Sequence, residues 1–197
     1  LTVKDTAGNG KMTAVYETGA EFRCPGMLIH GEEEAELTLT GGTYDVSAIR
    51  TDYDRSEGAA IAVYGKMTAN NITVRGYEKT VAADGTAIFI AKDAEATLEN
   101  ATVYGGSTKG NGGAIASAGA LTINGGTYNA GFAANGGVIA TSGTLTINGG
   151  TFNATNINGN GGVIYATGTV VINDGTFNGA RANAGGEIAS SGALVIN

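Results

Sequence analysis

The sequence predicts an all-β chain folded as a right-handed parallel β-helix (β-solenoid), with three short strands per turn and about seven to eight turns. Three observations lead to this prediction. A ten-residue phrase recurs, as LTINGGTYNA at 121–130, LTINGGTFNA at 145–154 and, altered, VVINDGTFNG at 170–179. The isoleucines of an aligned GGxI element recur 24 or 25 residues apart, at Ile115, Ile139, Ile164 and Ile188. Finally, 23 of the 34 glycines fall in 105–197, which disfavours a solenoid of helices.

Within one turn, apolar and polar residues alternate over runs of about four residues, which indicates short strands. In LTIN the leucine and isoleucine share one face, and in GTYN the aromatic residue lies opposite the threonine. The glycines between these runs permit positive φ and therefore sharp turns. For the turn that contains Ile115, we expect strands near 114–117, 120–123 and 126–129.

A unit of this length cannot enclose a core alone, but stacked copies can. Each strand then pairs in parallel with its copy in the next turn, ~4.8 Å away, so that like residues stack. Ile139 is expected to lie buried between Ile115 and Ile164. The asparagines that follow the second strand are expected to hydrogen-bond to their copies; they are Asn70, Asn124, Asn148, Asn173 and Asn197.

The whole chain, 1–197, is expected to form a single β-helix domain that belongs to a longer polypeptide with flanking domains. Residues 1–36 read as irregular first turns, 37–109 as turns with longer loops, and 110–197 as regular turns of 24 or 25 residues. The phrase KMTA occurs at 11–14 and again at 66–69, which predicts that Met12 lies in the same column as Leu37.

Composition excludes several classes of function. The net charge of −7 disfavours nucleic acid and anionic membranes, which require clusters of Lys and Arg. No apolar run approaches the ~20 residues of a membrane-spanning helix. Cys24 is the single cysteine and His30 the single histidine, so an internal disulfide framework and a His-rich metal site are both excluded.

Several stretches together resemble right-handed β-helix segments of large secreted and cell-wall surface proteins of bacteria, including adhesin-like ones. They are LTVKDTAGNGKMT, LTLTGGTYDVS, NGGAIASAGALTINGGTYN and NGGVIYATGTVVINDGTFN. The resemblance implies the β-helix fold and an extracellular or cell-surface location. Because such segments serve both as adhesin stalks and as glycan-active domains, it also implies a glycan or a host or cell-surface ligand as the partner.

Candidate functional residues concentrate in the stretch TYDVSAIRTDYDRSEG at 43–58 and in later loops. The predicted ligand-binding residues, called here the predicted loop site, are Asp45, Arg50, Asp52, Tyr53, Asp54, Arg55, Tyr77 and Tyr104. Tyrosines on loops stack on sugar rings and are common in recognition surfaces. The alternative interpretation is a solvated loop with local ion pairs and tyrosines that cover the sheet edge. Asp45, Asp52 and Asp54 are also a candidate Ca²⁺ site; no other metal or cofactor is expected.

We therefore expect a non-enzymatic extracellular module that presents a surface for adhesion or glycan binding, with no catalytic residue assigned. One alternative is a polysaccharide lyase or glycoside hydrolase that uses the acids of 45–57. Another is a purely structural stalk or fibre module. Ice binding by the regular threonine column is disfavoured, because the neighbouring column changes to valine at Val171 and Val195.

Overall fold

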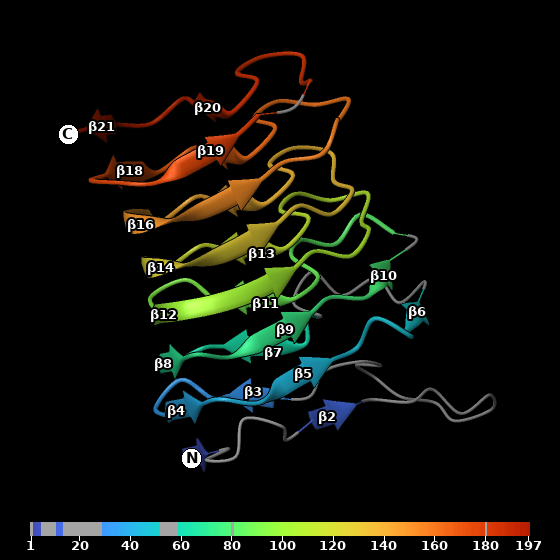
Figure 1. Cartoon of the computed structure of the whole chain (residues 1–197), viewed down its shortest axis with the longest axis vertical. Helices are drawn as coiled ribbons and strands as arrows, with labels where there is room; N and C mark the ends of the chain where they lie inside the picture. The colour runs from blue at the N-terminus through green and yellow to red at the C-terminus, as the bar shows by residue number, and fades with distance from the viewer. Residues whose placement is uncertain (1, 5–10, 14–28, 52–58, 80, 180) are drawn as a thin grey trace.

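The computed structural model describes residues 2–4, 11–13, 29–51, 59–79, 81–179 and 181–197 (Figure 1). Within these residues the regular structure is entirely β-strand, and successive turns stack along one axis from the N-terminal to the C-terminal end. Strands pair in parallel with their copies in neighbouring turns. The prediction of an all-β chain folded as a parallel β-solenoid is therefore confirmed. No helix in the described part of the chain is long and apolar enough to cross a membrane.

Two sheets form the walls of the solenoid. The seven-stranded sheet contains β3 (Ile29–Gly31), β7 (Ile61–Val63), β11 (Ile88–Ile90), β13 (Ile115–Ser117), β15 (Ile139–Thr141), β17 (Ile164–Ala166) and β20 (Ile188–Ser190). The twelve-stranded sheet contains β1 (Thr2–Lys4), β2 (Lys11–Thr13), β4 (Glu36–Thr40), β5 (Thr43–Asp45), β8 (Lys66–Asn70), β9 (Thr73–Arg75), β12 (Glu95–Tyr104), β14 (Ala120–Asn129), β16 (Thr144–Asn153), β18 (Thr169–Ile172), β19 (Thr176–Asn178) and β21 (Leu194–Ile196).

A third, two-stranded sheet pairs β6 (Arg50–Thr51) with β10 (Glu78–Lys79) on the side where the longer loops leave the solenoid (Figure 1). The structure contains about five turns, slightly fewer than the seven to eight expected. The difference arises at the two ends, where β1 with β2 and β20 with β21 belong to partial turns.

Stacked apolar columns make the core. Ile139 pairs in register with Ile115 on one side and Ile164 on the other, and its side chain is fully buried, as predicted. A second column stacks aromatic rings. The Phe152 ring lies 5.0 Å from that of Tyr128 and 4.9 Å from that of Phe177, with the planes inclined by 12° and 7°. Because every turn contributes one member to each column, the core runs the length of the solenoid.

The turn expected between the second and third strands is a bend inside one strand in the middle turns. The predicted strands 120–123 and 126–129 are both part of β14, which runs from Ala120 to Asn129 without a break. Gly125 and Gly126 lie at the bend with φ of 95° and 103°, a conformation that side chains other than glycine rarely adopt. Pairing with the neighbouring turn resumes directly after the bend, so the ladder continues around the corner.

The predicted asparagine ladder is present over 124–197. The Nδ2 group of each asparagine donates to the Oδ1 of the one a turn earlier: 2.7 Å for Asn148 to Asn124, 2.6 Å for Asn173 to Asn148 and 2.6 Å for Asn197 to Asn173. Asn124 donates in turn to the Glu99 carboxylate at 2.7 Å. Glu99 stands between the ladder and Asn70 in the register, and it takes the place of an asparagine there.

A second ladder was not predicted. Asn153 donates to Asn129 at 3.0 Å and Asn178 donates to Asn153 at 2.6 Å. These residues follow the aromatic column, so the polar ladder borders the stacked rings.

The prediction for Met12 is wrong. Met12 pairs with Tyr44, and it is Val3 on β1 that pairs with Leu39 two residues after Leu37. The residues KMT that the two segments share form only a polar–apolar–polar alternation. Strands on both sides of the bend have that alternation, so the short match does not fix the position in the turn.

Candidate functional site

Part of the predicted loop site forms one column beside the loop corner. Asp45 pairs in register with Arg75, and Arg75 pairs with Tyr104 in the next turn. The Arg75 guanidinium carbon lies 4.1 Å from the centre of the Tyr104 ring, a cation–π contact. The Asp45 carboxylate accepts hydrogen bonds from the backbone N–H and the hydroxyl of Ser47, at 3.0 and 2.6 Å. The structure thus brings Asp45 and Tyr104 to the same ladder through Arg75, which the sequence argument did not include.

The other members of that site lie in different surroundings. Tyr77 is only 3% exposed and packs in the core. Arg50 lies on β6 opposite Glu78. Four members, Asp52, Tyr53, Asp54 and Arg55, are outside the described residues. Ligand binding by this set therefore stays a prediction.

The candidate Ca²⁺ site stays a prediction for the same reason, because two of its three aspartates are outside the described residues. In the part of the chain that the structure covers, no group of three or more His, Cys, Asp and Glu side chains is placed to hold a metal ion.

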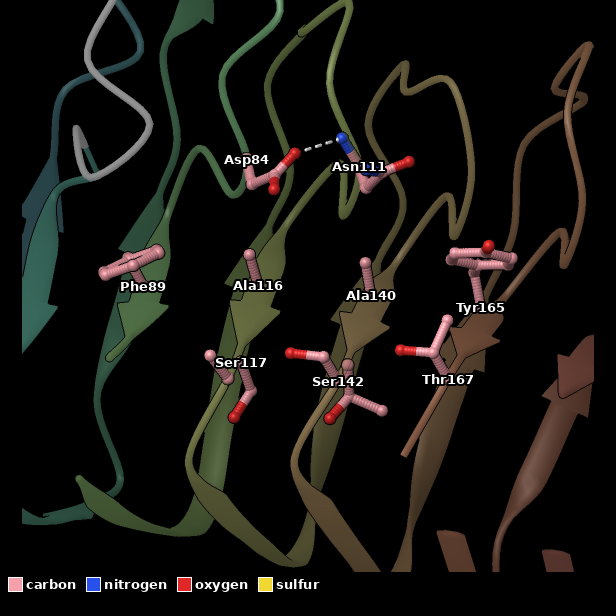
Figure 2. Close-up of a pocket in the computed structure, with 11 residues that line it drawn as sticks. Asp84, Phe89, Asn111, Ala116, Ser117, Ala140, Ser142, Tyr165 and Thr167 are labelled. Carbon is pink, nitrogen blue, oxygen red and sulfur yellow. Dashed lines mark hydrogen bonds between the residues drawn. The ribbon is translucent and has the colours of Figure 1, made fainter. Parts of the chain in front are cut away.

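The structure provides a different candidate on the outer face of the seven-stranded sheet, a groove of about 230 Å³ called here the alanine groove (Figure 2). Its axis follows one column: Phe89, Ala116, Ala140 and Tyr165 are the middle residues of β11, β13, β15 and β17 and pair in register. The two alanines form a low floor, and the rings of Phe89 and Tyr165 stand at its two ends. Three strand spacings of ~4.8 Å put the ends ~14 Å apart.

Polar groups border both sides of the alanine groove. Asp84 and Asn111 lie on one side of the row, and Ser117, Ser142 and Thr167 lie on the other (Figure 2). The Asp84 carboxylate accepts a hydrogen bond from the Asn111 backbone N–H at 2.7 Å. The groove therefore combines two aromatic rings, an apolar floor, one carboxylate and several hydroxyls, which is the mixture typical of small-ligand sites.

A buried hydroxyl lies beneath the floor of the groove. Thr141, on β15, lines the groove and is only 4% exposed. Its Oγ1 atom has no hydrogen-bond partner among the described residues. The corresponding hydroxyl one turn earlier, on Ser117, donates to the Gly119 carbonyl at 3.2 Å. Thr141 follows the outward-facing Ala140 on β15, and side chains alternate along a strand, so this hydroxyl faces the interior and is not available to a ligand in the groove.

Lys79 is buried beneath the side of the groove that contains Asp84. Its side chain is 2% exposed, and its Nζ donates to the carbonyl oxygens of Asp84 at 3.1 Å and Gly85 at 2.7 Å. The Tyr77 ring centre lies 5.3 Å from the same nitrogen. Burial lowers the pKa of Lys79 from 10.5 to about 8, although the Asp84 carboxylate opposes this shift. Lys79 is therefore charged near neutral pH in a buried location that disfavours the charged form.

This burial predicts that the folded protein becomes more stable as the pH rises from about 8 to 10. In that window the unfolded chain keeps the Lys79 proton and the folded chain has released it, so the unfolded state binds more protons and the unfolding free energy increases. The difference between 10.5 and about 8 corresponds to at most ~3 kcal/mol. Above pH 10 the trend reverses, because burial and then Glu99 raise the pKa of Tyr128, whose contribution is lost as the unfolded tyrosine ionises. Urea unfolding at pH 7, 8, 9, 10 and 11 measures both effects.

The matched variants are Lys79→Met, which should flatten the rise between pH 8 and 10, and Lys66→Met, which should leave it unchanged. Lys66 is an exposed lysine whose Nζ lies 3.5 Å from Glu95. Equal slopes in the wild type and in Lys79→Met would contradict the assignment.

Comparison of the chain with family models, with curated proteins and with solved structures gives no match.

Sequence reasoning missed the alanine groove, although a signal for it exists. The residue after each aligned isoleucine faces outward, and along the turns this column reads Ala62, Phe89, Ala116, Ala140, Tyr165 and Ala189. A pair of small residues between two aromatic ones indicates a depression between two rings. The inward columns define the core, and the outward column beside them lines the groove.

Proposed function

We propose that this β-solenoid is a non-enzymatic module that binds carbohydrate in the alanine groove, as part of a protein that acts in adhesion outside the cell or at its surface. The single observation that carries the proposal is the row Phe89–Ala116–Ala140–Tyr165, with two aromatic rings at the ends of a shallow apolar floor. Sugar rings have an apolar face that packs on aromatic rings and methyl groups, and hydroxyls at their rims that need hydrogen-bond partners.

The borders of the groove supply those partners. The hydroxyls of Ser142 and Thr167 both donate and accept hydrogen bonds, and the amide of Asn111 does the same. The Asn111 amide is already oriented, because its Oδ1 accepts a hydrogen bond from Asn135 Nδ2 at 2.8 Å. An oriented polar rim on a rigid sheet lowers the entropic loss on binding.

The charge of the groove selects among sugars. Asp84 is the single carboxylate among the lining residues, and the chain as a whole carries a net charge of −7. Neutral or basic sugars are therefore favoured over acidic ones. A glycosidase mechanism requires two carboxyl groups across the scissile bond, and the groove lining offers one, which supports binding without cleavage.

The test is a glycan array followed by calorimetry on the neutral or basic sugars that bind. The double variant Phe89→Ala with Tyr165→Ala is expected to weaken binding roughly tenfold or more, because both ring contacts are removed. Both side chains are partly exposed, so the variant is expected to keep the fold, which circular dichroism verifies. Incubation with the same glycans should release no reducing ends or unsaturated products.

Tyr104→Ala is the matched control, because it removes a partly buried aromatic ring from the predicted loop site and leaves the groove intact. Full affinity in Tyr104→Ala together with loss in the groove variant supports the proposal. Loss in Tyr104→Ala with full affinity in the groove variant would move the binding surface to the loop corner, and turnover of any glycan would contradict a purely binding role.

A further inference from the structure

The aromatic column does not stop at the end of the alanine groove. His30, the middle residue of β3, pairs with Ala62 on β7, and Ala62 pairs with Phe89. The Tyr64 ring lies 4.7 Å from the His30 ring and 6.2 Å from the Phe89 ring. Rings from three successive turns thus continue the line of the groove toward the N-terminal end of the solenoid.

Tyr64 also shows what fits above an alanine of this column. His30 and Phe89 stand two turns apart, and the Tyr64 ring lies between them, in contact distance of both. Ala62, the column residue of that turn, is fully buried. A six-membered ring therefore occupies the space above Ala62 and is supplied by the chain itself.

The next two alanine positions lack such a ring. The residues that correspond to Tyr64, directly after β13 and β15, are Ala118 and Ser142. Both are small, and both line the groove. The space above Ala116 and Ala140 is thus equivalent to the space that Tyr64 fills above Ala62, and it is open over two turns.

We infer that the groove holds an internal stretch of an extended, neutral polysaccharide that runs along the solenoid axis, with two sugar rings above Ala116 and Ala140 and the next ones over Phe89, Tyr64 and His30. This inference rests on the proposed function of the groove and adds the class and direction of its ligand. From Tyr165 to His30 the column spans five strand spacings, ~24 Å. A compact terminal sugar would contact only the groove, whereas a chain would contact the whole column.

Charge supports a neutral polymer along this line. Asp84 borders the groove, and Glu32 lies beside His30, with its carboxylate 3.6 Å from the imidazole Nε2. These carboxylates, one at the His30 end of the path and one beside its middle, repel a polyanion, whose repeated charges would meet each of them.

The experiment measures the affinity of neutral oligosaccharides of two to six units, in the cello-, xylo-, manno- and chito- series, for the wild type and for His30→Ala. For the series that binds, affinity is expected to rise roughly tenfold between two and five units, as further rings come into contact with the column. His30→Ala should remove a large part of this gain for the longer chains and leave the disaccharide affinity unchanged. The His30 side chain is 40% exposed, so its removal leaves the core intact.

A second variant tests the location directly. Ser142→Tyr places a ring above Ala140, as Tyr64 is placed above Ala62, and should abolish binding of every length while far-ultraviolet circular dichroism stays unchanged. Ser191→Tyr, which adds the same ring directly after β20 and outside the groove lining, should bind as the wild type. An affinity that stops rising at two units would overturn the extended ligand and leave the proposed carbohydrate-binding function standing. Absence of binding to all four series would overturn both.

Discussion

Gly143→Ala is expected to lower the free energy of unfolding by about 3 kcal/mol or more. Gly143 belongs to a column with Gly119 and Gly168 at the corner between the two large sheets. A Cβ atom on Gly143 would lie 2.6 Å from the Ala118 carbonyl oxygen and nearer still to that of Gly119, closer than the 3.0 Å that Cβ atoms keep from other heavy atoms. The Gly119 carbonyl accepts a hydrogen bond from the Thr144 N–H at 3.1 Å, so moving it aside breaks the ladder between two turns.

Gly149→Ala is the matched control for this prediction. A Cβ atom on Gly149 would have its nearest neighbours, backbone atoms of Gly125, at 3.9 Å, an ordinary van der Waals distance. Its unfolding free energy should stay within ~1 kcal/mol of the wild type. Urea denaturation followed by circular dichroism compares the two variants, and equal stabilities would refute the close stacking of the glycine corner.

Phe152→Ala should produce a loss of ~3–5 kcal/mol in unfolding free energy, as for other large-to-small changes of buried aromatic residues. The Phe152 side chain is fully buried, and its ring lies between the rings of Tyr128 and Phe177. Its removal opens a cavity and interrupts the aromatic column at its middle member. Neighbouring turns cannot collapse into that space, because the ladder hydrogen bonds fix their separation.

Phe132→Ala removes the same side chain from the surface, where Phe132 is 66% exposed. This variant should change stability by no more than ~0.5 kcal/mol. Thermal or urea unfolding of the two phenylalanine variants separates core packing from surface exposure. A loss below ~1 kcal/mol for Phe152→Ala would mean that the aromatic column contributes little to the folded state.

The inward columns were predictable because residues that stack in successive turns recur in the sequence at the length of one turn. Ile115, Ile139 and Ile164 recur at the length of one turn, and the structure pairs them in register. The asparagine ladder was predictable for the same reason, since hydrogen bonds between copies require like residues at like positions. Where the turns are regular, one alignment of the sequence is enough to place every strand.

Features that depend on differences between turns were not predictable in this way. The alanine groove exists because Ala116 and Ala140 interrupt a column that contains Phe89 and Tyr165, and an alignment that seeks constancy passes over such a change. Lys79 is buried because an irregular loop folds its carbonyls of 84 and 85 around the ammonium group. Nothing in the sequence around this lysine distinguishes it from a solvated one.

The asparagine ladder also carries a net dipole. Each side-chain amide from Asn197 to Asn124 points its N–H toward the preceding turn, so the amide dipoles are parallel and add along the solenoid axis. Hydrogen bonds in such a series polarise one another. The positive end of the series meets the carboxylate of Glu99, which makes one formal charge the terminus of an aligned dipole row four amides long. The solenoid therefore has a polarity along its axis that neither its apolar core nor its repeated strands would give it.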